Sequence, residues 1–446
     1  MRKAIAIFAA KMSAKLIKAL KLGNASSLPG RLALKIYPSL LRDYAGTLAD
    51  GSSSVRLAVS GTNGKTTSVG LLDSIYEVYA SKDNLISNRL GANLYYGVAT
   101  AFALSMSAAK QKQDFILEVD EAALRSVVKD LKPDLIALTN IFRDQLDRFG
   151  EIDTTRRFIQ EAIDEVKDVN LVINYDDTKI RSLKSSSGSK RYFYKLEIAD
   201  ELKSELNYEV SDKDSSLEDL DLENDIDEMY LIKAFLKKIT SSGSVFDLIY
   251  SGKSIEVNLN LPGIYNVYNA LLAASVFIAY DCPLGLIKEG LEAYQGSFGR
   301  AQNKIINGKS SNIFLIKNPK GCSEVLNLIK LDQNAMNLII INDDYADGRD
   351  VSWLWDADFE LLAATKQDSV DIDFVCSGNR AYDMALRLKY AGISASRIYV
   401  EEDISLALDY ASQNQEHRSL NVLPTYTALL YLEKILNLTE SIGLKN

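Results

Sequence analysis

Residues 57–70 read Leu-Ala-Val-Ser-Gly-Thr-Asn-Gly-Lys-Thr-Thr-Ser-Val-Gly, and this stretch decides the fold of the chain. Its first three residues are apolar and predict a short buried strand, while residues 69–79 predict a helix. The Gly-rich segment between them predicts a tight loop. Glycines let backbone N–H groups approach an anion, and the N-terminus of the helix adds partial positive charge. The order of strand, loop, Lys-Thr and helix therefore predicts a site for nucleotide phosphates.

Two side chains of this loop have distinct expected roles. Lys65 is expected to reach the β- and γ-phosphates, and the Thr66 hydroxyl to ligate Mg²⁺. The match is incomplete, because the usual motif has glycine where this chain has Val59. The alternative is a Gly-rich turn with a surface lysine, but the strand and helix on either side favour nucleotide binding. The predicted nucleotide-binding residues of the loop are Gly61, Thr62, Asn63, Gly64, Lys65, Thr66 and Thr67.

Length and composition limit the class of protein. At 446 residues the chain is long enough for two or three domains. Its net charge of −9 argues against nucleic acid as the main partner. The three cysteines, Cys282, Cys322 and Cys376, lie far apart, which predicts no disulfide framework and favours a reducing cytosol. No apolar run approaches the ~20 residues that span a bilayer.

Residues 1–50 predict a helical extension rather than a leader peptide, because spaced lysines and no small-residue cleavage site follow the apolar run at 4–10. At ~100° per residue, one side of this helix is apolar and the opposite side is basic. The apolar side holds Ile5, Phe8, Met12, Leu16 and Leu20, and the basic side holds Lys3, Lys11, Lys15, Lys18 and Lys21. Such helices are typical of peripheral membrane contact. We expect instead that the apolar side packs on the next domain, and that a second helical segment at 31–47 follows Pro29-Gly30.

Residues 51–300 are predicted to form a nucleotide-binding α/β domain. Apolar strands at 115–119, 135–138 and 171–173 end in polar residues and alternate with helical segments, which indicates a doubly wound, parallel sheet. The carboxyl ends of such strands face the ligand crevice. Glu118 is therefore a candidate for the Mg²⁺ site, the alternative being an exposed acid at the end of a strand.

Two further features of this region are polar. Asn266 and Asn269 stand at the start of a predicted helix, where they either cap the helix or recognise the base. Residues 200–228 hold 13 acidic residues against two lysines, which is typical of a solvated loop or linker.

Several motifs, taken in order, resemble those of Mur ligases, the ATP-dependent ligases of bacterial cell-wall peptides. They are residues 61–67, the pattern Thr139-Asn140, Asp144 and Leu146-Asp147, the pair Asn266 and Asn269, and Gly299-Arg300. The resemblance implies ATP as the nucleotide, a P-loop central domain with a mostly parallel sheet, and a smaller Rossmann-like α/β C-terminal domain. Only about fifty residues precede the loop, too few for the domain with which typical Mur ligases hold UDP-sugar.

The closer resemblance is to the MurT subunits of lipid II isoglutaminyl synthases, which lack that domain. It rests on residues 139–150, on Ile316-Lys317-Asn318-Pro319 and on residues 345–356, and it covers nearly the whole chain. Gln145 replaces a histidine of typical Mur ligases and still offers Mg²⁺ an oxygen. Lys317 replaces a second histidine of typical Mur ligases and is expected to keep a cation near the phosphates. An acidic segment at 195–245 takes the place of the four-cysteine ribbon of many MurT subunits, so no zinc is expected.

Residues 301–446 are predicted to form the smaller α/β domain. Apolar strands at 337–341, 371–376 and 397–400 alternate with helices. An acidic loop at 342–350 follows the first of them. It is either a solvated turn or, because both tryptophans follow it at positions 353 and 355, part of a functional edge or interface.

The resemblance implies ATP-dependent amidation of the D-glutamate α-carboxyl group of lipid II, a membrane-borne substrate, through an acyl phosphate. The reaction would take place in the cytoplasm, at the inner face of the membrane. The implied catalytic residues at the phosphates are Lys65, Glu118, Arg300 and Lys317. The implied nucleotide contacts outside the loop are Arg300, Asn266 and Asn269, and the implied Mg²⁺ ligands are Thr66, Glu118 and Gln145.

The nitrogen source is expected to be a second protein. Releasing ammonia from glutamine normally needs a cysteine activated by a histidine. The only histidine, His417, lies in a polar stretch, and the three cysteines lie in apolar or helical contexts. The resemblance implies a GatD-like glutaminase as the partner, with Asp350 completing the Cys-His triad of that partner across the interface.

Two other functions stay open at the level of sequence. One is a Mur-type ligase that adds an amino acid without a partner, and the other is a nucleotide-gated scaffold for cell-wall enzymes. Consumption of ATP with an amino acid, rather than with ammonia, would separate the first function from amidation. Nucleotide binding without any product would support the second.

Overall fold

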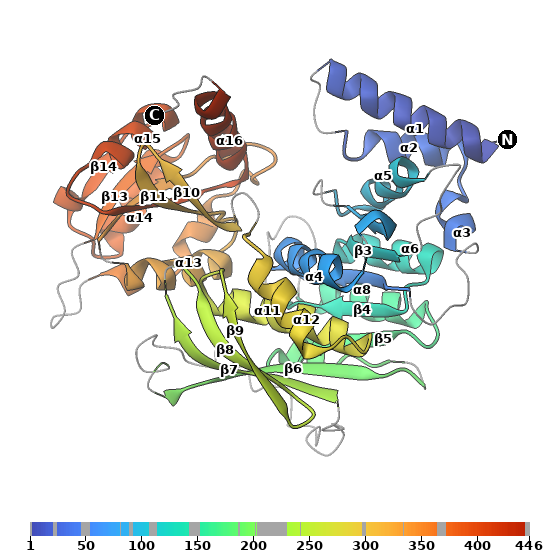
Figure 1. Cartoon of the computed structure of the whole chain (residues 1–446). Coiled ribbons are helices and arrows are strands. Elements are labelled where there is room, and N and C mark those ends of the chain that lie inside the picture. The colour runs from blue at the N-terminus through green and yellow to red at the C-terminus, as the bar shows by residue number, and fades with distance from the viewer. Residues whose placement is uncertain are drawn as a thin grey trace. The chain divides into compact units, whose positions relative to one another are not determined.

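The computed structural model of the chain describes most of its residues. They are residues 2–20, 25–45, 54–80, 82–88, 92–106, 114–141, 152–185, 188–200, 202, 230–240, 242–296, 300–332, 334–363 and 372–441. The chain divides into two compact units, shown in Figure 1. The first comprises Met1–Lys237, Val245–Leu259 and Tyr265–Tyr294, and the second comprises Lys238–Ser244, Asn260–Ile264 and Gln295–Asn446.

The first unit is built on a sheet with the strand order β2-β3-β1-β4-β5-β6-β7-β8-β9. Its strands are β1 (Arg56–Ser60), β2 (Leu85–Ser87), β3 (Asp114–Glu118), β4 (Leu135–Leu138), β5 (Asn170–Asn174), β6 (Arg191–Ile198), β7 (Leu231–Ile239), β8 (Ser244–Tyr250) and β9 (Lys253–Leu259). Every pair from β2 to β7 is parallel. The expectation of a mostly parallel α/β sheet is therefore confirmed. Most of the acidic segment at 200–228 lies outside the described residues.

Helices pack on this sheet through apolar faces. They are α4 (Lys65–Tyr79), α5 (Tyr95–Ser105), α6 (Glu121–Leu131), α8 (Ile152–Asp164), α9 (Thr178–Arg181), α11 (Ile264–Ala279) and α12 (Leu284–Ala293), with a short 3₁₀ turn at Lys82–Asn84. Local sequence fixes where several begin: the Asp120 carboxylate accepts a hydrogen bond from the Ala122 N–H and caps α6. Leu124, Val128 and Leu131 of that helix join the core beneath β1, β3 and β4. The buried apolar side chains of α5, α6, α8 and α9 belong to one cluster with residues of β1, β3 and β4, the strands that lead into the site.

The N-terminal helices also join this core. They are α1 (Arg2–Ala19), α2 (Leu28–Ile36) and α3 (Leu40–Ala45), and α1 does so through a face that we did not expect. In α1 the buried residues are Ala6, Ala10 and Ala14, which let the helix approach α2 and α5 closely. The large apolar side chains that we expected to pack on the domain are exposed instead. That expectation is wrong, because small alanines rather than large side chains form the contact. Pro29-Gly30 does not precede the second helical segment, as we expected, but lies in the first turn of α2, where proline is favoured.

The second unit has a sheet of order β10-β11-β15-β12-β13-β14, in which β10 and β11 are antiparallel and the other pairs are parallel. Its strands are β10 (Arg300–Ile306), β11 (Lys309–Phe314), β12 (Ala335–Ile340), β13 (Asp373–Ser377), β14 (Ile398–Val400) and β15 (Ser419–Pro424). Its helices are α13 (Pro319–Leu331), α14 (Ala381–Tyr390), α15 (Ile404–Gln413) and α16 (Tyr426–Ser441), with 3₁₀ turns at Ser352–Trp355, Phe359–Leu362 and Ala395–Arg397. The three strands predicted from the apolar runs are β12, β13 and β14, so the Rossmann-like expectation is confirmed.

Helix α12 packs closely against α4, the helix that follows the phosphate loop, and a glycine makes this approach possible. A Cβ atom on Gly290 would overlap the Ile75 Cα atom and lie 2.8 Å from the Ile75 backbone nitrogen. The Gly290 carbonyl also accepts a hydrogen bond from Ser74 Oγ at 2.7 Å. The backbone of α4 cannot retreat without losing this contact and its own packing on β1 and β3.

We therefore expect Gly290→Ala to lower the free energy of unfolding by about 1–3 kcal/mol, the usual effect of overpacking. The matched control is Gly285→Ala on the same helix, where nothing lies within 4 Å of the added Cβ atom. That control should be neutral or stabilise the protein by up to ~1 kcal/mol, because alanine is the better helix former. Urea unfolding of both variants measures the difference, and equal stabilities would show that the α4–α12 contact is looser than described.

Candidate active site

The phosphate loop follows β1 and turns into α4, as the sequence predicts. Gly61 has φ +123° and Gly64 has φ +87°, in the left-handed region that favours glycine. Each glycine also touches another element. A Cβ atom on Gly61 would overlap Thr139 Oγ1 beyond β4, and one on Gly64 would overlap Asn269 Oδ1 of α11. Both glycines are required by conformation and by space.

The N-terminus of α4 suits a bound phosphate. Its N-cap residue, Gly64, has no side chain to cap the helix, and the first hydrogen bond across the helix start is from the Ser68 N–H to the Gly64 carbonyl, at 2.8 Å. The N–H groups of Lys65, Thr66 and Thr67 consequently have no partner within the helix. These donors and the positive end of the helix dipole together favour the binding of an anion at this position. The residues of the loop therefore fit the phosphates of a nucleoside triphosphate.

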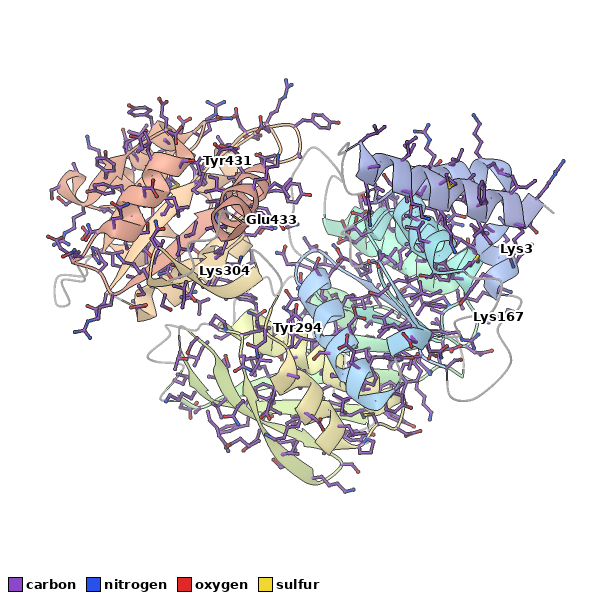
Figure 2. The ribbon with its side chains drawn as sticks, turned by 45° about the horizontal axis from the view of Figure 1, so that its top comes forward. Lys3, Lys167, Tyr294, Lys304, Tyr431 and Glu433 are labelled. Atoms are coloured by element: carbon purple, nitrogen blue, oxygen red, sulfur yellow. The ribbon has the colours of Figure 1, made fainter. Side chains whose placement is uncertain are left out.

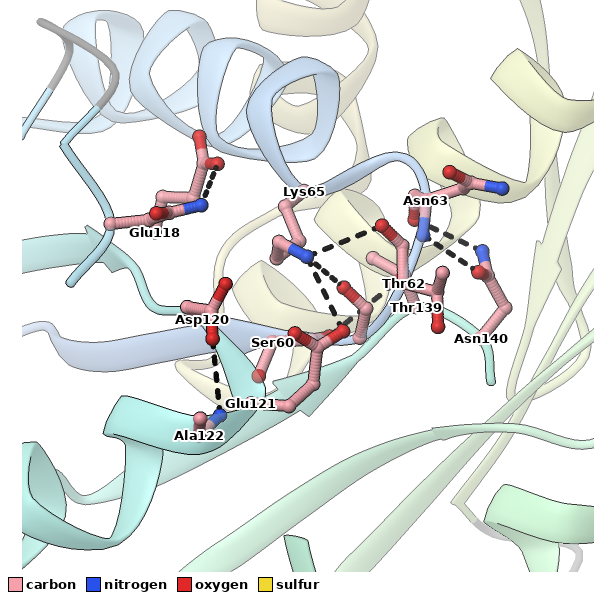
Figure 3. A network of polar contacts seen from close by, with 12 residues as sticks. Ser60, Thr62, Asn63, Lys65, Glu118, Asp120, Glu121, Ala122, Thr139 and Asn140 are labelled. Carbon is pink, nitrogen blue, oxygen red and sulfur yellow. Dashed lines mark hydrogen bonds and ion pairs between the residues drawn. The ribbon is translucent and has the colours of Figure 1, made fainter. Parts of the chain in front are cut away.

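Asn140, after β4, holds the loop in this conformation. Its Oδ1 atom accepts a hydrogen bond from the Asn63 N–H at 2.9 Å, and its Nδ2 group donates to the Asn63 carbonyl at 3.0 Å. The Asn140 carbonyl accepts a third bond, from the Thr62 N–H at 2.8 Å. Figure 3 shows Asn140 facing Asn63 across the loop. The Thr139-Asn140 motif is thus a clamp on the phosphate loop, a role that its sequence position alone does not reveal.

Lys65 is a buried cation, with 9% of its surface exposed. Its Nζ group donates to the carbonyls of Gly61 and Thr62, the latter at 3.2 Å, and lies 3.4 Å from Glu121 Oε1. Figure 3 shows Lys65 and Glu121 directed toward each other. Burial raises the pKa of Glu121 above its ordinary value, and the charge of Lys65 offsets only part of this effect. The lysine is held at the loop, within reach of any phosphate bound there.

Thr66 and Glu118 meet at the expected Mg²⁺ position. The Thr66 hydroxyl donates to Glu118 Oε2 at 2.6 Å, and the Asn93 Nδ2 group donates to Glu118 Oε1 at 3.2 Å. Asn88 fixes the backbone of Glu118 from both sides, at 2.9 Å to its N–H and 2.7 Å to its carbonyl. A hydroxyl and a carboxylate oxygen at one point are suitable Mg²⁺ ligands. The third predicted ligand, Gln145, lies outside the described residues.

Asn266 and Asn269, both buried, lie at the start of α11. Asn269 Oδ1 accepts a hydrogen bond from Ser68 Oγ at 3.2 Å, and its Nδ2 group donates to Asn266 Oδ1 at 3.2 Å. Because Asn269 also touches Gly64, the pair supports the start of α4. Recognition of the base by these two residues stays a prediction.

The other predicted site residues belong to the second unit. Arg300 begins β10, and Lys317 is half-buried directly before α13. The Asn318 side chain caps α13 by accepting a hydrogen bond from the Gly321 N–H at 2.8 Å, and proline follows at the next position. Asp350 is exposed, and its Oδ1 atom accepts a hydrogen bond from the Ser352 N–H at 2.8 Å. Hydrogen bonds from the Ser352 side chain and backbone hold the pKa of Asp350 below its ordinary value.

Known proteins identify the family of this chain. The Mur ligase middle domain family matches residues 59–277, and the MurT ligase C-terminal family matches residues 315–429. A protein of Streptococcus pneumoniae named lipid II isoglutaminyl synthase (glutamine-hydrolyzing) subunit MurT is 31% identical over 93% of each chain. Its namesake from Staphylococcus aureus is 32% identical over 98% of each chain. The chain belongs to the MurT family. It is therefore an ATP-dependent ligase of the Mur type, as its motifs imply.

Solved structures agree with this fold. MurF from Acinetobacter baumannii matches with a TM-score of 0.67 at 18% identity, over 91% of this chain and 80% of that one. MurF from Thermotoga maritima in complex with ADP matches with a TM-score of 0.62 at 14% identity, over 92% and 84%. At these identities the likeness shows the shared fold alone.

The cysteines and the histidine take structural positions. Cys282, Cys322 and Cys376 are buried, and burial raises the pKa of Cys282 to about 11 and that of Cys376 to about 12. His417 lies 2.9 Å from Asp373, an acidic residue rather than a thiol. A thiol with a raised pKa is a poor nucleophile at neutral pH.

Sequence reasoning missed the residues that support the site. Glu121 pairs with Lys65, Asn88 and Asn93 hold Glu118, and Asn140 clamps the loop. A usable signal existed for Glu121, because it lies three residues beyond Glu118, the last residue of β3. The other partners follow strands β2 and β4, so the rule that polar residues gather at the carboxyl edge of a parallel sheet also applies to them.

The raised pKa of Glu121 has a measurable consequence. Because its folded-state pKa lies above the unfolded value, this carboxyl group contributes stability at low pH that is lost as the pH rises through the raised pKa. Glu121→Gln keeps the shape and cannot ionise, so its stability relative to the wild type should increase over the pH range above the ordinary pKa of a glutamate, about 4.3. Urea unfolding across that range measures it, with exposed Glu416→Gln as the control for loss of one charge. A difference independent of pH would contradict the buried, desolvated environment of Glu121.

Proposed function

We propose that this chain is the synthetase subunit that amidates the D-glutamate α-carboxyl group of lipid II, giving D-isoglutamine. The observation that carries the proposal is a phosphate loop with a buried lysine and a Thr66–Glu118 pair, in a chain that belongs to the MurT family. The relatives bear the name lipid II isoglutaminyl synthase, which names the acceptor and the product. Because that acceptor is carried by a lipid, we expect the reaction at the cytoplasmic face of the membrane.

The chemistry follows from the poor reactivity of a carboxylate. A carboxylate oxygen attacks the γ-phosphorus of ATP, ADP leaves, and the product is an acyl phosphate. Ammonia then attacks the acyl carbon, and inorganic phosphate leaves with the electron pair of the broken C–O bond. Little of this needs covalent help from the protein, so positioning and charge stabilisation account for most of the catalysis.

The residues of the first unit would supply that stabilisation. Lys65 would turn from the loop carbonyls to the phosphates, while the N–H groups at the start of α4 hold phosphate oxygens. Thr66 and Glu118 would hold Mg²⁺, with Gln145 as a third ligand, and that ion would neutralise charge on the phosphates. Asn266 and Asn269 would line the nucleotide side. From the second unit, Arg300 and Lys317 would add positive charge at the transferred phosphoryl group.

The nitrogen would come from a glutaminase partner of the GatD type. The relatives are named glutamine-hydrolyzing, and each is named as a subunit. Within the part of the chain that the structure describes, His417 pairs with Asp373 and no cysteine bonds to a histidine, and burial raises the pKa values of Cys282 and Cys376. These features support a nucleophile supplied by another protein.

Asp350 is the residue that we assign to that partner. Other acids of the same loop support the fold: Asp343 pairs with Arg380 at 2.8 Å, and Asp347 accepts a hydrogen bond from the Thr427 N–H at 2.7 Å. Asp350 contacts only Ser352 of its own loop among the described interactions, and its lowered pKa keeps it ionised. The neighbouring Trp355 is 52% exposed, and exposed tryptophan is enriched at protein interfaces.

Lys65→Ala tests the nucleotide site. We expect amidation to fall by on the order of a thousandfold even with free ammonia, because the main cation at the phosphates is lost. The readout is mass spectrometry of the amidated product formed from lipid II, ATP and ammonia. The exposed Lys184→Ala is the matched control and should retain wild-type activity. Wild-type turnover by Lys65→Ala would remove this lysine from the mechanism, and turnover with amino acids in place of ammonia would favour a peptide ligase.

Asp350→Asn tests the partner contact. We expect the glutaminase rate of the complex, and with it glutamine-dependent amidation, to fall by on the order of a hundredfold, because the imidazole of the partner loses its orienting carboxylate. Amidation with free ammonia should be unchanged. Asp356→Asn, a nearby exposed carboxylate, is the control. An unchanged glutaminase rate in the Asp350→Asn complex would refute the assignment.

A further inference from the structure

Helix α1 has three different faces. Three of its alanines, Ala6, Ala10 and Ala14, are buried against the rest of the first unit. On the opposite side, five large apolar side chains point away from that contact. They are Ile5, Phe8, Met12, Leu16 and, just after the helix, Leu20, and they are 49 to 67% exposed. We call these five residues the apolar stripe of α1.

Packing within the described residues does not account for this stripe. A helix that needs only to cover its neighbour places its large apolar residues on the inner face and polar residues outside. Here the order is reversed, since alanine lies inside while phenylalanine and leucine lie outside. Five such residues over about four turns leave a continuous apolar surface in water, which marks an interaction site rather than scattered exposure.

Basic residues border the stripe. At ~100° per residue, Lys15 lies next to the stripe around the helix axis, and Lys11 and Lys18 lie farther from it on the same side. Lys15 and Lys18 are exposed, whereas Lys11 is tied to the structure by a hydrogen bond to the Met106 carbonyl at 2.5 Å. Figure 2 shows the side chains that project from α1, with Lys3 labelled. The helix therefore presents an apolar surface with cations beside it.

The charge is concentrated in this part of the chain. Residues 1–45 contain nine lysines and arginines and a single acidic residue, Asp43, whereas the whole chain has a net charge of −9. Helix α2, which packs on α1, adds the exposed Arg31 and Lys35. A basic patch on an otherwise acidic protein is complementary to an anionic surface.

We propose that α1 docks the protein on the surface of an anionic lipid bilayer, with the apolar stripe among the acyl chains and the lysines at the headgroups. Protein interfaces are depleted in lysine, while lysine beside large apolar residues is the pattern of helices that lie in a membrane surface. Lys15 and Lys18 can place their alkyl stems along the stripe and their ammonium groups among phosphates. No described helix is both long and apolar enough to cross a bilayer, so the helix would lie in the plane of the surface.

Docking of this kind would serve the proposed function. An acceptor carried by a lipid is confined to the membrane, so an enzyme held there meets it by diffusion in two dimensions. The usefulness of α1 thus rests on the proposed acceptor, but binding of the helix to lipid does not. Vesicle binding needs neither ATP nor acceptor, so the two proposals can fail separately.

The experiment measures sedimentation of the full chain with vesicles of phosphatidylglycerol and phosphatidylcholine. We expect the wild type to bind anionic vesicles and to bind pure phosphatidylcholine vesicles much less. Leu16→Ser should weaken partitioning on the order of tenfold, because one large apolar side chain no longer enters the bilayer. Leu406→Ser is the matched control, since Leu406 is 59% exposed and Leu16 is 60% exposed.

Charge is tested separately. Lys15→Glu with Lys18→Glu should abolish the preference for phosphatidylglycerol, and Lys389→Glu on α14 should not. All four variants change exposed side chains, so their thermal unfolding should match that of the wild type. Absence of wild-type binding, or equal binding to both lipids, would overturn the proposal. It would also fall if Leu16→Ser left lipid binding intact but dissociated a dimer or the complex with the glutaminase.

Discussion

The site depends on a close approach of backbone segments that only glycine permits. Gly61 lies against Thr139 beyond β4, and Gly64 lies against Asn269 of α11. With a side chain at either position, the loop would have to move away from the sheet or from α11. The same approach brings the Asn140 side chain to both polar groups of the Asn63 backbone. One steric constraint therefore fixes the loop conformation. The loop conformation in turn directs the first N–H groups of α4 toward the position expected for the phosphates.

The sheet register explains how residues far apart in sequence meet at this loop. Strands β1 and β3 are parallel neighbours, and Val59 pairs with Glu118. The chain leaves β1 into the loop and leaves β3 into α6 at the same edge, so Thr66 faces Glu118 and Lys65 faces Glu121. Two carboxylates and one cation share a buried place there. The pairing of Lys65 with Glu121 offsets part of the desolvation, which explains how an ammonium group can be held at the site before any phosphate binds.

The sequence is most informative where one physical rule acts alone. Apolar runs of three to five residues located β1, β3, β4 and β5, because strands buried on both faces show uniform hydrophobicity. The phosphate loop could be predicted because its residue types have separate roles. Glycine allows close approach of the backbone, lysine contacts phosphates, and threonine ligates Mg²⁺. Prediction failed where two rules competed. In α1 the periodicity was correct, but the assumption that the larger apolar residues lie inside was not, since close helix contact favoured alanine. Asn88 and Asn93 follow β2, and only the strand order of the sheet, with β2 beside β3, shows that they support Glu118.

Two carboxylates of the chain show how environment separates roles for one functional group. Glu121 is buried beside Lys65, and loss of water raises its pKa. Asp350 is exposed at a loop, and hydrogen bonds from Ser352 lower its pKa. Because Glu121 is desolvated, its ionised form is less stable than in water, and the charge of Lys65 offsets only part of that cost. Asp350 is ionised in water, as its proposed role of orienting the imidazole of a partner requires. The pKa values of the two carboxyl groups therefore move in opposite directions for reasons local to each residue.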